Sequence, residues 1–137
     1  MDDKDFTLKP IPFKHFIPGI LWFILVLVLI CLPGQDVPKI DAWSDFLESI
    51  HFDKMVHAGM FGVMALLFCM PYYKTDLSLT EKNNRFIWVG LLACIWGLTT
   101  ECIQLYVPGR SFDLWDWAAD SFGVGVGLLF MKRFKRV

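Results

Sequence analysis

Four long apolar runs dominate this chain of 137 residues, and charged residues, proline or glycine bound each run. The hydrocarbon core of a bilayer is about 30 Å thick, and a helix of about 20 apolar residues crosses it. The sequence therefore predicts a single all-α integral membrane domain over residues 1–137, built as a bundle of four transmembrane helices. The predicted spans are residues 16–33, 55–73, 86–107 and 114–131.

Composition excludes several other classes of protein. Hydrophobic residues make up 55% of the chain and charged residues only 20%, which is too apolar for a small soluble domain. The net charge of −1 creates no basic field, so we expect no nucleic-acid partner. The four cysteines lie in the apolar runs without a C-x-x-C pair, and we expect buried thiols and no cofactor.

Positive charge is distributed unevenly along the chain. Most lysines and arginines precede the first span, lie between the second and third, or follow the fourth. Cytoplasmic loops are enriched in these residues, so both termini are predicted to be cytoplasmic and the protein to be multi-pass. In the first outer loop, Ile40, Trp43, Leu47 and Ile50 recur at helical spacing. This pattern predicts a short amphipathic helix, either resting in the headgroups or acting as a functional lid.

Ionisable side chains occur inside the predicted spans, where each one costs about 2.5 to 3.5 kcal/mol at mid-helix. They all lie near the outer ends of their helices. The helical rise places Glu101 and Asp120 at one depth and His57 about one turn further out. Spacings of three, four and seven residues give each helix one polar face. Because lipid cannot solvate these faces, we expect them to form an outward-facing polar pocket. The candidate pocket residues are Asp53, Lys54, His57, Glu101, Gln104, Arg110, Asp113, Asp116 and Asp120.

The connection between the third and fourth spans is short. Pro108 ends one helix, Gly109 permits a positive φ, and Ser111 or Asp113 can cap the next helix. The turn predicts that these two helices are antiparallel neighbours. Arg110 in the turn has a side chain that pairs with a carboxylate of the cluster or with an anionic ligand, and the sequence leaves both possibilities open.

Small residues recur at four-residue spacing in two of the spans. Ala119, Gly123 and Gly127 form one such ridge, and Ala58 with Gly62 forms a second. Ridges of this kind let helix backbones approach closely in membranes. We interpret them as packing surfaces.

Taken together, these residues resemble the VanZ family. The resemblance rests on Asp53-Lys54-x-x-His57-x-x-x-Phe61 at the start of one span, Glu101-x-x-Gln104 at the end of the next, and then Pro108-Gly109-Arg110, Asp113 and Asp116. It extends over about residues 52–130. It implies a small protein of the bacterial cytoplasmic membrane that is linked to resistance against the lipoglycopeptide teicoplanin, with vancomycin little affected. The site residues implied by the family are Asp53, Lys54, His57, Glu101, Gln104, Arg110 and Asp116. Family members often carry Asn where this chain has Asp120.

Three functions fit this sequence. The favoured one is a binding protein for a molecule with a polar head and an apolar tail, such as a membrane lipid, a lipid-linked cell-wall precursor or a lipidated glycopeptide antibiotic. The second is an enzyme acting on such a lipid, with Glu101 or an aspartate as general acid or base and His57 assisting. The third is a proton- or ion-coupled carrier, which the absence of ionisable groups in the inner half of the spans disfavours.

A metal centre has weak support in the sequence. Asp53, His57, Glu101 and Asp116 could jointly hold a divalent cation, but one histidine is few for such a site, and we expect no metal. The sequence leaves open the physiological ligand, the oligomeric state and whether the protein is an enzyme.

Overall fold

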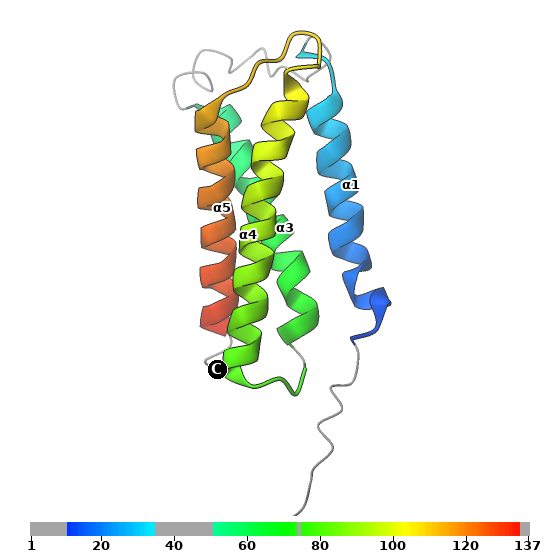
Figure 1. Cartoon of the computed structure of the whole chain (residues 1–137), viewed down its shortest axis with the longest axis vertical. Helices are drawn as coiled ribbons and strands as arrows, with labels where there is room; N and C mark the ends of the chain where they lie inside the picture. Colours follow the sequence, from blue (N-terminus) through cyan, green and yellow to red (C-terminus); the bar gives the residue numbers. More distant parts are fainter. Residues whose placement is uncertain (1–10, 35–50, 74, 135–137) are drawn as a thin grey trace, which may run out of the picture.

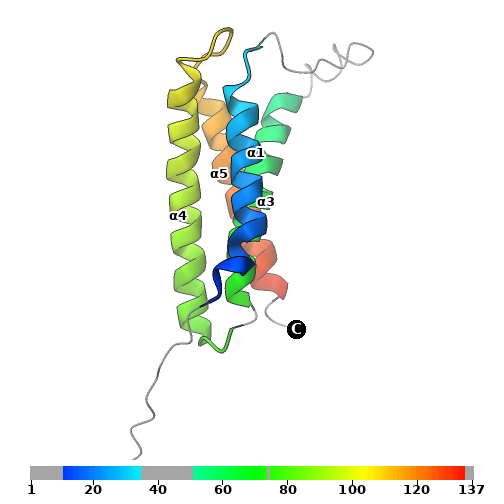
Figure 2. The ribbon, with the colours of Figure 1, turned by 90° about the vertical axis from the view of Figure 1, so that its right-hand side faces the viewer.

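The computed structural model describes residues 11–34, 51–73 and 75–134, and its regular secondary structure is entirely helical within these ranges. The elements are the short 3-10 helix η1 (Phe13–Phe16), α1 (Ile17–Cys31), α3 (Phe52–Tyr73), α4 (Leu79–Gln104) and α5 (Leu114–Phe134). The four α-helices lie side by side and alternate in direction along the bundle (Figures 1 and 2). The all-α prediction is confirmed, while the amphipathic helix expected around Ile40 to Ile50 lies outside the described residues.

Three of these helical segments are long and apolar enough to cross a membrane. They are Phe13–Cys31, Phe52–Tyr73 and Leu79–Gln104. The α5 helix has 21 residues but does not reach the same mean hydropathy, since it carries Asp116 and Asp120 near its start. Its outer surface is nevertheless apolar, because large side chains such as Phe122 and Leu129 are exposed.

The helix boundaries differ from the predicted spans mainly at α4. The helix begins at Leu79, seven residues before the predicted start, because Ser78 and Glu81 form a capping box. The Ser78 hydroxyl accepts a hydrogen bond from the Glu81 backbone N–H, and the Glu81 carboxylate accepts one from the Ser78 backbone N–H. The helix ends at Gln104 rather than residue 107, in a turn in which the Val107 N–H donates to the Gln104 carbonyl.

The closest helix contact joins α3 and α5 through their small residues. A Cβ atom added to Gly127 would lie 2.6 Å from the Gly62 carbonyl oxygen, and one added to Gly123 would overlap the carbonyl oxygen of Ala58. Only glycine permits backbones to approach this closely. The predicted packing role of these small residues is confirmed.

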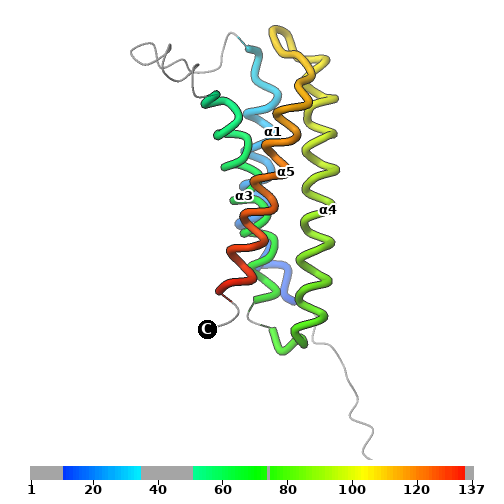
Figure 3. The backbone as a smooth tube through the Cα atoms, turned by 90° about the vertical axis from the view of Figure 1, so that its left-hand side faces the viewer, coloured from blue at the N-terminus to red at the C-terminus, as the bar shows by residue number. Residues whose placement is uncertain are grey.

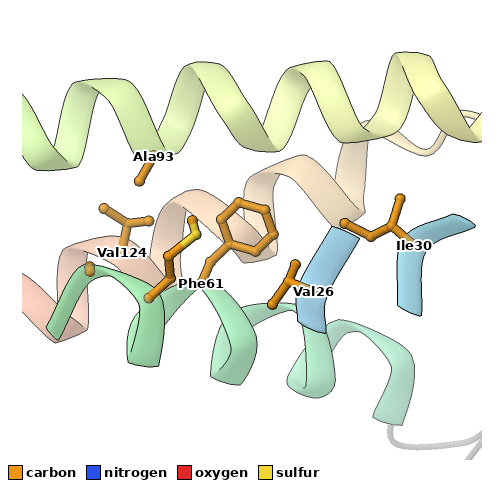
Figure 4. Close-up of a cluster of buried hydrophobic side chains, with 7 residues drawn as sticks. Val26, Ile30, Phe61, Ala93 and Val124 are labelled. Carbon is orange, nitrogen blue, oxygen red and sulfur yellow. The ribbon is translucent and has the colours of Figure 1, made fainter. Parts of the chain in front are cut away.

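A hydrophobic core fills the space between the helices. Figure 4 shows Val26 and Ile30 of α1 facing Phe61 of α3, with Ala93 of α4 and Val124 of α5 beside them. All of these side chains are buried. The core therefore draws on all four α-helices.

Two further observations concern α1 and the cysteines. The Trp22 indole N–H donates a 2.9 Å hydrogen bond to the Met60 carbonyl and joins α1 to α3. The expectation of four buried thiols is wrong, because Cys69 is buried but Cys31 and Cys102 are exposed on the outer surface of the bundle. A thiol on a lipid-facing surface needs no burial in protein, since it behaves as a small apolar side chain.

Candidate functional site

The candidate site lies where α3 begins, α4 ends and α5 begins. Figure 3 shows these three segments at one end of the bundle, where a short connection joins α4 to α5. Six ionisable side chains meet there, and we call them the polar cluster. Its members are Lys54, His57, Glu101, Asp113, Asp116 and Asp120.

Lys54 is the cation of the outer part of the polar cluster. Its Nζ atom donates a 2.8 Å hydrogen bond to Asp116 Oδ1 and a 2.9 Å hydrogen bond to Asp113 Oδ2. The lysine belongs to the first turn of α3, whereas both aspartates belong to the start of α5 or the turn before it. One ammonium group therefore ties the two helices together at this end.

His57 lies one turn deeper on α3. Its Nδ1 atom is 3.0 Å from Asp120 Oδ1, and its Nε2 atom is 3.9 Å from Asp116 Oδ2. The imidazole thus bridges two successive carboxylates of the α5 face. The side chain of His57 reaches across to α5 and contacts the Asp120 carboxylate directly.

Glu101 and Asp120 are fully buried, with no exposed surface on either side chain. Glu101 Oε2 accepts a 2.9 Å hydrogen bond from the backbone N–H of Asp113. Glu101 Oε1 and Asp120 Oδ2 have no hydrogen-bond partner in the described part of the chain. Buried carboxylate oxygens in this state are costly unless a proton, a water molecule or a cation satisfies them.

Asp113 contacts both Lys54 and Glu101: its carboxylate accepts a hydrogen bond from Lys54, and its backbone N–H donates one to Glu101. Its Oδ1 atom accepts a 2.8 Å hydrogen bond from the Trp115 backbone N–H, so it is Asp113, of the two candidates, that caps α5. The hydrogen bond that Lys54 donates, aided by the one from Trp115, lowers the pKa of Asp113 below its usual value. The capping group is therefore held in its anionic form.

Three of the predicted site residues lie at the margin. Asp53 has 62% of its side chain exposed, and its ion pair within the described ranges is with the neighbouring Lys54, at 3.4 Å. Gln104 is buried beside the cluster. Arg110 is half-buried, forms no ion pair within the described ranges, and has a buried Nε without a hydrogen-bond partner. Of the two possibilities that the sequence leaves open for Arg110, the salt bridge to the cluster is absent from the described residues.

Gly97 contributes to the site, although the sequence analysis did not identify it. A Cβ atom at this position would lie 3.1 Å from Asp120 Oδ2 and 3.3 Å from a ring carbon of Phe61. The missing side chain leaves room for the carboxylate of Asp120 against α4. The spacing of the sequence indicates this position, because Gly97 lies four residues before Glu101 and therefore on the same helix face.

The sequence profile of the VanZ/LLP1 family matches residues 11–135, which is nearly the whole chain. The chain belongs to the VanZ/LLP1 family. Comparisons with curated proteins and with solved structures found no match.

The site of this VanZ/LLP1 family member has the chemistry for two kinds of task. Its outer part contains two cationic side chains: Lys54, which is bound to Asp113 and Asp116, and Arg110, which forms no ion pair in the described ranges. Its inner part brings one donor atom of each of His57, Glu101 and Asp120 to within 4.8 Å of the others. Such a group can exchange protons or hold a cation, depending on whether a proton, a water molecule or a cation binds Glu101 Oε1 and Asp120 Oδ2.

Proposed function

We propose that this VanZ/LLP1 family member binds the polar head of an amphiphilic cell-envelope molecule at the end of the bundle that carries the polar cluster. The class of ligand is a membrane lipid, a lipid-linked cell-wall precursor or a lipoglycopeptide antibiotic such as teicoplanin. The observation that carries the proposal is a network of charged groups at the end of a bundle whose outer surface is apolar. An amphiphile presents the same two features to the protein, a polar head and an apolar tail.

Arg110 supports an anionic head group. Arg110 lies in the turn between α4 and α5, and the carboxylates of Asp113, Asp116 and Glu101 are engaged by Lys54 or by a backbone N–H group. Within the described residues Arg110 has no carboxylate partner, and such an arginine offers a planar set of donors to a phosphate or carboxylate ligand. The head group is therefore expected to meet Arg110 first.

The proposal includes a cytoplasmic-membrane location with four spans, in which α5 is the fourth. The α5 helix packs against α3 through backbone contacts and has an apolar outer surface. Figure 1 shows η1, the start of α4 and the end of α5 at the end of the bundle away from the polar cluster, and these segments carry Lys14, Lys82, Arg85, Lys132 and Arg133. This distribution favours a cytoplasmic position for that end and an outer position for the polar cluster.

Single-cysteine labelling tests the topology. Starting from a chain without its native cysteines, Ser111→Cys and Asp76→Cys place a thiol in the connections at opposite ends of the bundle. A membrane-impermeant maleimide added to intact cells is expected to label only the cysteine at position 111. Labelling at position 76 alone would reverse the orientation, and labelling at both positions would contradict the four-span topology.

Antibiotic susceptibility tests the binding function. A bacterial host lacking the protein would express the wild-type chain, Arg110→Ala, Glu101→Gln or, as a matched control, Arg85→Ala from the exposed opposite end. We expect the wild type and Arg85→Ala to raise the teicoplanin concentration that inhibits growth, with vancomycin little affected, and the other two variants to lose this protection. Equal membrane expression must be verified. Full protection by Arg110→Ala would refute the assigned role of the arginine.

A second candidate function is catalysis on a lipid-linked substrate, and the His57–Asp120 contact favours it. A carboxylate that orients an imidazole through one ring nitrogen leaves the other nitrogen available for proton transfer. Mass spectrometry of lipid-linked precursors incubated with the purified protein would detect turnover. Turnover that disappears in His57→Ala would establish the enzyme, whereas unchanged substrate would favour binding alone.

A further inference from the structure

We propose that His57, Glu101 and Asp120 form a binding site for a divalent transition-metal ion, and that Zn²⁺ suits the donor set best. The site lies at the deep end of the polar cluster, between α3, α4 and α5. It differs from the set that the sequence suggested, because Asp120 takes the place of Asp53 and Asp116. The inference does not depend on the identity of the amphiphile bound by the protein.

The three side chains have the spacing of metal ligands. One donor atom of each lies within 4.8 Å of a donor atom of the others. Zinc bonds to histidine nitrogen and to carboxylate oxygen are about 2.0 to 2.2 Å long, so neighbouring ligand atoms in a tetrahedral site are about 3.3 Å apart. The 3.0 Å separation between His57 Nδ1 and Asp120 Oδ1 is close to that value.

Two of the three ligands, Glu101 and His57, also have a partner outside the set that orients them. Glu101 Oε2 is held by the backbone N–H of Asp113, which leaves Oε1 without a partner in the described structure. The second ring nitrogen of His57 faces Asp116, the kind of carboxylate partner that metal-binding histidines commonly have. Asp116 is in turn held by Lys54. Glu101 and His57 therefore have the supporting contacts of preorganised ligands.

The free oxygens point to a cation. Glu101 Oε1 and Asp120 Oδ2 are both buried and lack a partner among the described residues, and neither side chain has any exposed surface. When a metal ion binds and the ligands lose their protons, the carboxylates carry two negative charges and the imidazole none, and one divalent ion neutralises them. Gly97 keeps space open next to Asp120 Oδ2, because a Cβ atom there would approach it to 3.1 Å.

The donor chemistry selects among metals. Imidazole suits Zn²⁺ better than Mg²⁺ or Ca²⁺, which prefer six or more oxygen ligands. Three protein ligands also leave the fourth position of a tetrahedral zinc ion open, as in sites that bind a water molecule or an external ligand. A zinc ion here would therefore have one coordination position left for such a molecule.

Metal content of the full-length protein tests the inference. The chain would be produced with a tag that contains no histidine, purified in detergent, incubated with Zn²⁺, desalted and measured by inductively coupled plasma mass spectrometry. We expect about one zinc ion per wild-type chain. Less than about one tenth of an ion per chain would overturn the proposal.

Variants locate the ion within the chain. Glu101→Gln and Asp120→Asn are each expected to weaken zinc affinity by at least about tenfold, the scale seen when metal sites lose even supporting groups. Asp53→Asn, at an exposed carboxylate outside the ligand set, should retain the full zinc content. Undiminished zinc in Glu101→Gln and Asp120→Asn would place the ion elsewhere and refute the site.

Measurements on the wild type alone test the proposal even where a variant does not fold. The Co²⁺-substituted chain should show visible absorption bands of a low-coordinate site, and Zn²⁺ should displace the cobalt. Zn²⁺ should also raise the unfolding temperature of the chelator-treated protein, because it binds only the folded state. Absence of both effects would overturn the proposal. Antibiotic susceptibility is read separately, so failure of one proposal remains distinguishable from failure of the other.

Discussion

The contact between α3 and α5 yields a sharp prediction, because α5 carries three glycines with different surroundings. A Cβ atom at Gly127 would lie 2.6 Å from the Gly62 carbonyl oxygen, and one at Gly123 would overlap the Ala58 carbonyl oxygen. A Cβ atom at Gly125 would have no neighbour within 4 Å. Alanine substitution at the three positions therefore adds the same methyl group to very different environments.

The expected magnitudes follow from two opposing effects. Replacing glycine by alanine inside a helix stabilises the helix by about 1 kcal/mol, and Gly125→Ala should show this gain or no change. At Gly127 the obstacle is backbone, so the helices must separate by nearly 1 Å to restore ordinary contact. Overpacking of this kind costs about 1 to 3 kcal/mol. Gly127→Ala should therefore be less stable than Gly125→Ala by about 2 kcal/mol, and Gly123→Ala less stable still.

Unfolding in detergent micelles measures this series. Titration with sodium dodecyl sulfate, followed by circular dichroism, gives the free energy of unfolding of each variant. The expected order of stability is Gly125→Ala at or above wild type, then Gly127→Ala, then Gly123→Ala. Equal stability of the three variants would refute the close backbone contact between α3 and α5.

Further predictions concern two other contacts between helices: Trp22 joins α1 to α3, and Lys54 joins α3 to the start of α5. Trp22→Phe removes the hydrogen bond to the Met60 carbonyl and should lower the free energy of unfolding by about 1 kcal/mol, measured by the same titration. Lys54→Met leaves the carboxylates of Asp113 and Asp116 without their cation and should cost about 2 kcal/mol. The lowered pKa of Asp113 stabilises the folded state above the ordinary aspartate pKa of about 3.9, and this contribution is lost as the pH falls through the lowered value. Acidification from pH 7 to pH 3 should therefore destabilise the wild type more than Lys54→Met, and equal losses would contradict the role of the lysine.

The helices themselves could be predicted from local pattern. Apolar runs of the length that a bilayer requires identified all four α-helices, since burial in lipid or protein is the only stable environment for them. The early start of α4 was also readable, because Ser78 and Glu81 have the spacing of a capping box. The packing of Gly123 and Gly127 was predicted from their spacing alone and is confirmed.

The residues of the candidate site could be predicted as one polar face on each of three helices. Polar residues three, four and seven positions apart lie on one side of a helix, and burial of these sides against one another follows from their poor solvation in lipid. The pattern predicted that Glu101, His57 and Asp120 lie in one region, and the structure places one donor atom of each within 4.8 Å of the others. Helical spacing says nothing, however, about which group pairs with which.

Only the tertiary structure decided those pairings. Lys54 binds Asp113 and Asp116 rather than Asp53 alone, and His57 contacts Asp120. These choices depend on how far α3 is shifted along α5 and rotated about its axis. Glycine contacts between the two backbones set that shift, and a displacement of one turn, about 5.4 Å, would exchange every partner. The sequence by itself determined which side chains share a face, and the helix packing determined which of their atoms meet.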